Sequence, residues 1–323
     1  MTWVVWRQHR AESLITLGVL AALAVFLLIT GLEMHYTFQH QESFADCMAH
    51  LQERPGGCGF VQGGLPSEFW DQYQWLVGFP IFLLPLPVLL GALVGAPLVA
   101  REVEQRTFVL AWTQSISRVR WLGVKLALVL GAGVLLFGVL LAEVIWWWGP
   151  FAQYQGSFSG NAAFDFTGPV LPAAALLALS LGVFAGALTR RTVLAIFLTL
   201  ALFLAIRLPV EMGWRPHFLP PITVTWPIEQ TTPPVTVSVQ DWLIDSGLID
   251  AQSKPYKGAV LSYCDNPESF AQCAQSQGFQ AYYLTYQPAD RFWTFQWMET
   301  GIYVGVAALA LLATVWLVRR RLS

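Results

Sequence analysis

Six apolar segments, each long enough to cross a lipid bilayer, constrain this chain more than any other feature of its sequence. A helix needs roughly 20 mainly apolar residues to cross the ~30 Å hydrocarbon core, because it rises about 1.5 Å per residue. The segments that meet this requirement are 14–32, 75–100, 122–148, 170–188, 193–210 and 298–318. We therefore predict an all-α membrane protein with six transmembrane helices.

The amino-acid composition supports this prediction. The chain has 323 residues, of which 55% are hydrophobic and 12% are charged, whereas a soluble domain carries roughly 25% charged residues. So few charges cannot solvate the surface of a chain of this length, and lipid must cover much of it. The formal net charge of −2, with no basic block larger than Arg319–Arg321, gives no indication of nucleic-acid binding.

The distribution of Lys and Arg predicts which side of the membrane each loop faces, because short cytoplasmic loops carry an excess of both. With a cytoplasmic N-terminus, 12 of the 18 Lys and Arg residues fall in inner segments. The segments 33–74, 149–169 and 211–297 are then extracellular, and 149–169 contains neither Lys nor Arg. We predict that both termini are cytoplasmic.

Residues 1–13 place Trp3 and Trp6 beside Arg7 and Arg10 just before the first span. This pattern predicts a short amphipathic helix in the inner interface, although an ordinary basic flank explains it equally well. The first span is not typical of a signal peptide, because it is longer than an h-region of about 7–15 residues and has no small-residue cleavage site.

All four cysteines, Cys47, Cys58, Cys264 and Cys273, fall in segments that the charge distribution places outside. Disulfides persist in oxidising compartments, so we predict two local bridges, Cys47–Cys58 and Cys264–Cys273. Four cysteines allow three connectivities, and a bridge between the two segments stays open. Neither pair has the C-x-x-C spacing of a metal site.

Prolines and charges inside the spans mark a candidate transport path. The second span contains Pro80, Pro85, Pro87 and Pro97, and proline kinks a helix because it removes a backbone donor; Pro85 and Pro87 are the candidates here. Ionisable groups inside a membrane are costly and point to function. Glu143 and Arg207 are such groups, and they either form a structural ion pair or line the exit path. Asp165, in an interfacial loop, is expected to be solvated.

The segment 101–121, between the second and third spans, is the most informative for function. It reads REVEQRTFVLAWTQSISRVRW, in which a charged cluster precedes a short amphipathic turn, a polar turn and a basic return to the membrane. We predict a short helix across the inner surface, available to a cytoplasmic partner.

This segment resembles the coupling-helix region of type-2 ABC transporter permeases, which carry an R-E-x-E-x-G-T…T-x-S-x-S/T-R…K-L pattern after the second span. The chain departs from that pattern at Gln105-Arg106, which changes the expected local turn. The phrases WVVWRQHR (3–10), FDFTG (164–168), RRT (190–192) and RPH (215–217) are also similar to such permeases, and the wording is closest to actinobacterial members. The segment 211–297 shows little of this likeness.

The resemblance implies a six-span permease in a bacterial cytoplasmic membrane, working as a homodimer or with a related permease. It also implies two copies of an ABC ATP-binding subunit, which bind ATP and Mg²⁺, while this chain holds no cofactor of its own. The residues that would contact that subunit are Glu102, Glu104, Arg106, Trp112, Thr113 and Arg118. The substrate would be an apolar or amphipathic compound, such as an antibiotic, peptide or lipid, moved outward.

The sequence has no G-x-x-x-x-G-K-[ST] motif, so a P-loop ATPase must come from another chain. It also lacks H-E-x-x-H, G-x-S-x-G and paired carboxylates deep in a span. Two alternatives remain. A sensing or force-transmitting complex would act on an extracellular partner through 211–297, and an intramembrane enzyme would need polar catalytic groups at membrane depth.

Overall fold

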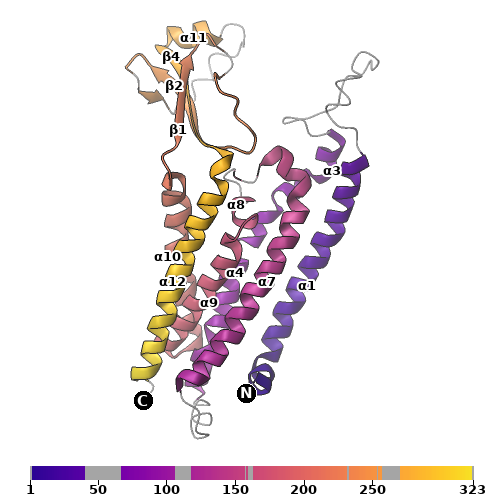
Figure 1. The fold of residues 1–323 in the computed structure, drawn as a ribbon, viewed down its shortest axis with the longest axis vertical. Helices are drawn as coiled ribbons and strands as arrows, with labels where there is room; N and C mark the ends of the chain where they lie inside the picture. Colours follow the sequence, from indigo (N-terminus) through magenta and orange to yellow (C-terminus); the bar gives the residue numbers. More distant parts are fainter. Residues whose placement is uncertain are drawn as a thin grey trace.

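The computed structural model describes residues 2–40, 67–105, 118–156, 158, 163–230, 233–252, 254–256 and 270–321. Within them, six helical stretches are long and apolar enough to cross a membrane. Both termini lie at one end of this bundle, here called the terminal end, and a small β-sheet lies beyond the other, here called the sheet end (Figure 1).

The first span is part of one long helix, α1 (Thr2–His40). Residues 2–13 form the first turns of α1 and not a separate helix; the predicted interfacial position of this segment stays a prediction. The third span is α7 (Arg118–Gln155), and the fourth and fifth are α9 (Val170–Thr189) and α10 (Thr192–Leu208). The sixth, α12 (Phe292–Arg321), begins before the predicted boundary at residue 298.

The second span is not one helix but five short pieces. In chain order these are α3 (Ser67–Val77), the 3₁₀ turn η2 (Phe79–Leu83), α4 (Leu86–Leu90), the π-helical turn η3 (Gly91–Gly95) and α5 (Pro97–Glu104). A proline stands in the first turn of η2, α4 and α5, where its missing N–H costs no helical bond. The helical geometry of this span therefore changes at its prolines, the residues from which the sequence indicated a kink.

Helix α9 forms the centre of the bundle, with 83% of its most apolar stretch buried. It packs against α12, α10, α7 and the broken second span. Glycines allow close backbone contact: a Cβ added to Gly182 would overlap the carbonyl oxygen of Gly91, and one added to Gly186 would overlap that of Ala96. Small residues at such positions are typical of tightly packed membrane helices.

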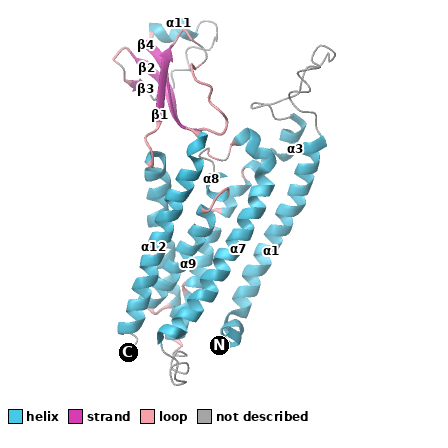
Figure 2. Ribbon diagram, viewed as in Figure 1, coloured by secondary structure: helices cyan, strands magenta, loops and turns pink. Residues whose placement is uncertain are grey.

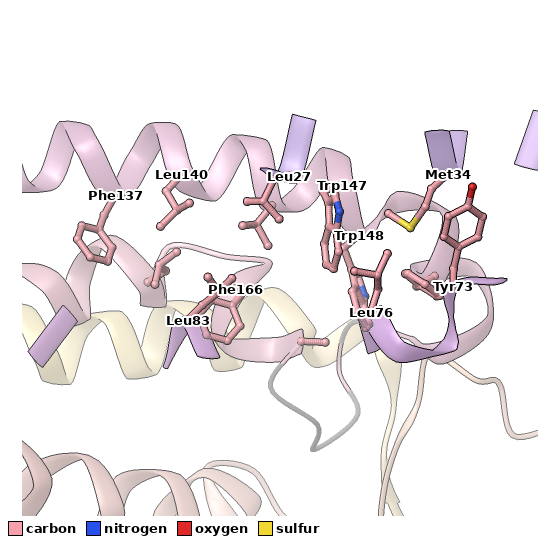
Figure 3. Close-up of a cluster of buried hydrophobic side chains, with 14 of the residues drawn as sticks. Leu27, Met34, Tyr73, Leu76, Leu83, Phe137, Leu140, Trp147, Trp148 and Phe166 are labelled. Carbon is pink, nitrogen blue, oxygen red and sulfur yellow. The ribbon is translucent and has the colours of Figure 1, made fainter. Parts of the chain in front are cut away.

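A second apolar cluster joins the peripheral helix α1 to α7 and the start of the second span. Leu27 and Met34 of α1 pack with Leu76, Leu140 and Trp147 in this cluster (Figure 3). Among residues 18–40 of α1, whose burial is described, the buried ones are Leu27, Gly31 and Met34. There Trp147 Nε1 donates a hydrogen bond to Thr30 Oγ1 at 2.9 Å.

The segment 211–297 contains a β-sheet, so the all-α description does not hold there (Figure 2). Its antiparallel strands have the order β1-β4-β2-β3. Their bounds are β1 (Ile222–Pro227), β2 (Trp242–Asp250), β3 (Pro255–Tyr256) and β4 (Phe279–Gln287). The sequence PVTVSV at 234–239 is rich in residues that favour strands, but it is not a strand; it lies in the connection between β1 and β2.

One face of the sheet is covered by α11 (Phe270–Ser276). Ala274 of this helix is buried against Ile228, Leu248 and Phe279. The sheet therefore has a hydrophobic core of its own, separate from that of the bundle. Of the four cysteines, only Cys273, on α11, lies among the described residues, and it is not a free thiol. The pairing of all four stays a prediction.

Candidate functional site: charge clusters at the two ends of the bundle

At the terminal end, a buried ion pair joins the second span to the third. Glu102 of α5 accepts a hydrogen bond from Lys125 Nζ of α7, and both side chains are buried. The Lys125 ammonium also lies 4.6 Å from the centre of the Trp121 ring. Such a pair tolerates burial because each charge neutralises the other. The pair fixes the end of α5 against α7.

Two residues further on, Glu104 joins the same helix to α10. Its Oε2 accepts hydrogen bonds from the backbone N–H of Thr192 at 3.1 Å and from Thr192 Oγ1 at 2.8 Å. The carboxylate thus caps the N-terminus of α10, where unpaired N–H groups and the helix dipole favour negative charge. The turn before it places Arg190 at φ 58°, a left-handed backbone conformation, and exposes Arg190 and Arg191.

The remaining predicted coupling residues lie at or beyond the edge of this site. Arg106, Trp112 and Thr113 are outside the described residues, and Arg118 is the first residue of α7. The segment 106–117 is therefore preceded by α5, which is bonded to α7 and α10, and is followed by α7. The predicted contacts of these residues with an ATPase stay predictions.

At the sheet end, a network of buried charges joins four elements of the structure. Asp165 lies in the short helix α8 (Ala163–Phe166) and is 3% exposed. It contacts Arg207 of α10 at 3.1 Å and Arg215 of the 3₁₀ turn η5 (Arg215–His217) at 2.7 Å. Arg215 also binds Glu299 of α12. The prediction that Asp165 is solvated was wrong, because it balances two buried guanidinium groups.

Further side chains complete this network. Glu211, in the π-helical turn η4 (Pro209–Trp214), lies 3.4 Å from Arg207. Tyr303 donates a hydrogen bond to Glu299 at 2.8 Å. The Arg215 guanidinium also stands 4.5 Å from the centre of the Phe164 ring. Three carboxylates and two guanidiniums therefore meet at one site, which is buried except at the half-buried Glu211, and each has a partner of opposite charge.

Glutamine side chains tie the sheet to this network. Gln287, at the end of β4, donates hydrogen bonds to the carbonyls of Pro216 and Leu219, and Gln296 of α12 donates one to that of Phe164. Gln240, from the β1–β2 connection, donates another to the carbonyl of Ala152 on α7. These bonds join the end of β4 to the segment before β1, α12 to α8, and the β1–β2 connection to α7.

The predicted transport-path residues are not brought together. Arg207 pairs with Asp165 and Glu211, so the expected pair with Glu143 does not form. Glu143 is half-buried on α7 and has no hydrogen bond or ion pair to any residue that the structure describes. Pro85 is exposed at the N-terminus of α4, and Pro87 is buried in its first turn.

Sequence reasoning missed the roles of Asp165, Arg215 and Glu299. The available signal was their position: each is a charged residue within a few positions of a long apolar segment, at its sheet end. Metal binding finds no support in the described ranges, where no group of three His, Cys, Asp or Glu residues could hold an ion.

A family model described as ABC-2 membrane transporter related matches residues 17–215. That range is more than half of the chain and runs from the first span through α10 to Arg215, at the centre of the sheet-end network. No curated protein and no solved structure matches the chain. The family, the six apolar helical stretches and the shared position of the termini agree on a multi-pass membrane protein, and the chain belongs to the ABC-2 membrane transporter related family.

Proposed function

We propose that this chain is the membrane-spanning permease subunit of an ABC exporter whose ATP is hydrolysed by a separate polypeptide. The family match over residues 17–215 is the observation that carries this proposal. The cargo is an apolar or amphipathic compound, such as an antibiotic, a peptide or a lipid, moved outward. This class of cargo rests on analogy with transporters of similar architecture.

The terminal end faces the cytoplasm in this proposal, and the membrane is a bacterial cytoplasmic membrane. Its support is the charge distribution, because Arg101, Arg190, Arg191 and Arg319–Arg321 all lie at that end. An excess of Lys and Arg is typical of the cytoplasmic side. The sheet, the segment 33–74 and the two predicted disulfides would then lie outside, where thiols are oxidised.

The ATP-binding subunit would dock on the segment 106–117, with Arg106, Trp112, Thr113 and Arg118 at or beside the contact. Glu102 and Glu104 were expected to contact the ATPase, but in this proposal they connect the segment to neighbouring helices. Glu102 is buried against Lys125, and Glu104 is bonded to Thr192. A push on the segment would therefore reach α7 through the first pair and α10 through the second.

Two copies of the permease, or one copy and a related chain, would bind two ATPase subunits, each with its ATP and Mg²⁺. Closure of the ATPases on nucleotide would tilt the bundles relative to one another. The second span is suited to such movement, because prolines interrupt it and its helical geometry changes between α-, 3₁₀- and π-type along its length.

A second candidate function is favoured by the attachment of the sheet. Arg215, in the turn that leads into the sheet, binds Asp165 of α8 and Glu299 of α12, and Gln287 of β4 bonds to Pro216 of the same turn. A movement of these helices would therefore be carried to the sheet without any cargo crossing the membrane. The chain would then transmit force to, or sense, an extracellular partner.

Transport assays in inside-out membrane vesicles separate the two functions. Vesicles that contain the chain and its ATPase should accumulate a labelled amphipathic compound only when ATP and Mg²⁺ are added. Vesicles in which the P-loop lysine of the ATPase is replaced are the matched control. ATP hydrolysis without accumulation of any compound from a broad panel would favour force transmission over export.

A further inference from the structure

Glu143 differs from the other charged side chains inside the bundle. Lys125 neutralises Glu102, and the sheet-end network provides partners for Asp165, Glu211 and Glu299. Glu143 lies in the apolar part of α7, one turn before the Trp146-Trp147-Trp148 run, and no described residue bonds to it. An unpaired carboxylate at this depth is costly, which makes it a candidate for binding a positive group from outside the chain.

The side of α7 that carries Glu143 faces α1. Residues three and four apart share one side of a helix, so Glu143 lies beneath Trp146 and Trp147. Trp147 donates its hydrogen bond to Thr30 of α1, and a Cβ added to Gly31 would meet the ring of Trp146. The carboxylate therefore stands at the α1–α7 seam, immediately below the point where two tryptophans close it.

Toward the terminal end the same seam is open. Val139 and Ala132, which precede Glu143 by four and eleven residues on the same side of α7, are exposed, Val139 by 60%. Leu136, between them, is half-buried. The wall of the seam is thus apolar and accessible from the bilayer, and its closed end holds one carboxylate with indole rings above it.

We propose that Glu143 binds the positive group of a lipophilic organic cation that enters the α1–α7 seam from the bilayer. The proposal rests on the export function above and narrows its cargo to amphipathic compounds with a cationic centre. Charge complementarity at the closed end selects the cation, because a carboxylate in an apolar medium attracts it strongly. The apolar wall, which includes the exposed Val139, accommodates its hydrocarbon part.

The test is equilibrium binding of radiolabelled tetraphenylphosphonium to the purified full-length chain in lipid nanodiscs. Neutral triphenylmethane serves as the uncharged competitor. Glu143→Gln keeps the size of the side chain and removes its charge, and we expect it to weaken binding by roughly tenfold or more, since a charge-assisted contact is lost. The matched control is Glu33→Gln, which removes an exposed carboxylate of α1 near the same end and should leave binding unchanged.

A second variant guards against misfolding of the first. Val139→Trp leaves the carboxylate intact but fills the seam beside it, and it should also weaken binding. Unchanged affinity in Glu143→Gln, or in Val139→Trp if Glu143→Gln does not fold, would overturn the proposal, as would equally strong binding of the neutral competitor. The binding assay needs no ATPase. A negative result would therefore overturn the cation site but not the export function, and failure to find an associated ATPase would not affect the cation site.

Discussion

The guanidinium group of Arg215 donates two hydrogen bonds to the carboxylate of Glu299, one from Nε and one from Nη2, each 2.7 Å long. This two-pronged contact joins the turn that leads into the sheet to the helix that leads out of it. Because Asp165 accepts a further bond from the same Nη2, three elements that are distant in sequence meet at one buried cation. We regard Arg215 as the residue that fixes the sheet on the bundle.

Replacing Arg215 by Met should destabilise the protein strongly. The change leaves Glu299 buried without its cation, and breaking a buried pair from one side costs roughly 3–5 kcal/mol. Thermal unfolding of the purified protein in detergent measures the effect. The double variant Arg215→Met with Glu299→Leu removes both charges and should recover much of the loss. A double variant as unstable as the single one would contradict this account of the pair.

Lys125→Met should likewise destabilise the terminal end, because Glu102 would remain buried without a partner. We expect a loss of roughly 3–5 kcal/mol, and a smaller loss when Glu102→Gln is combined with it. The same unfolding measurement tests this. Full stability of the single Lys125→Met variant would show that Glu102 does not depend on this ion pair.

Glu104 and Thr192 should act together in coupling rather than in folding. Both lie at the exposed terminal end, so Glu104→Ala and Thr192→Val are each expected to leave the unfolding temperature nearly unchanged. Each should reduce ATP-driven transport, and the double variant should be no worse than the single ones, because both remove one connection. Thr192→Ser, which keeps the hydroxyl, is the control. Additive losses would mean that the two residues act independently.

Close packing of α9 against the second span should make Gly182 intolerant of even one added carbon. Gly182→Ala would press a methyl group against the backbone of Gly91, and overpacking costs roughly 1–3 kcal/mol. Gly131→Ala on α7 meets nothing within 4 Å and should be neutral or slightly stabilising, because Ala favours helix. Yield and unfolding temperature of the two variants give the comparison, and equal behaviour would contradict the packing.

The spans could be predicted from sequence because length and hydropathy alone define a membrane helix. The prolines likewise indicated that the helix of the second span is kinked. The sheet could not be predicted: β1 and β4 pair across 50 or more residues, and the composition of 211–297 shows neither a clear alternation nor a hairpin turn. The one β-prone stretch that stood out, 234–239, is a connection instead.

The charge network was hidden for a different reason. Arg215 is separated from Asp165 by 50 residues and from Glu299 by 84, and nothing in the local sequence of any of them identifies the partner. Arg207 was recognised as a costly charge, but Glu143 of the third span, the acid considered as its partner, does not pair with it; Asp165 and Glu211 do. Only the packing of α8, α10 and α12 decides which charges meet.

Affinity purification of the tagged chain in mild detergent, with identification of the proteins that come with it, tests the central claim most directly. We predict stoichiometric recovery of a P-loop ATPase and Mg²⁺-dependent ATP hydrolysis by the complex. We further predict that this ATPase is lost when Arg106, Trp112 and Thr113 are replaced by Ala together, while the unfolding temperature of the chain is kept. Recovery of the chain alone in several detergents, with no ATPase activity, would contradict the claim that it is the membrane subunit of an ABC transporter.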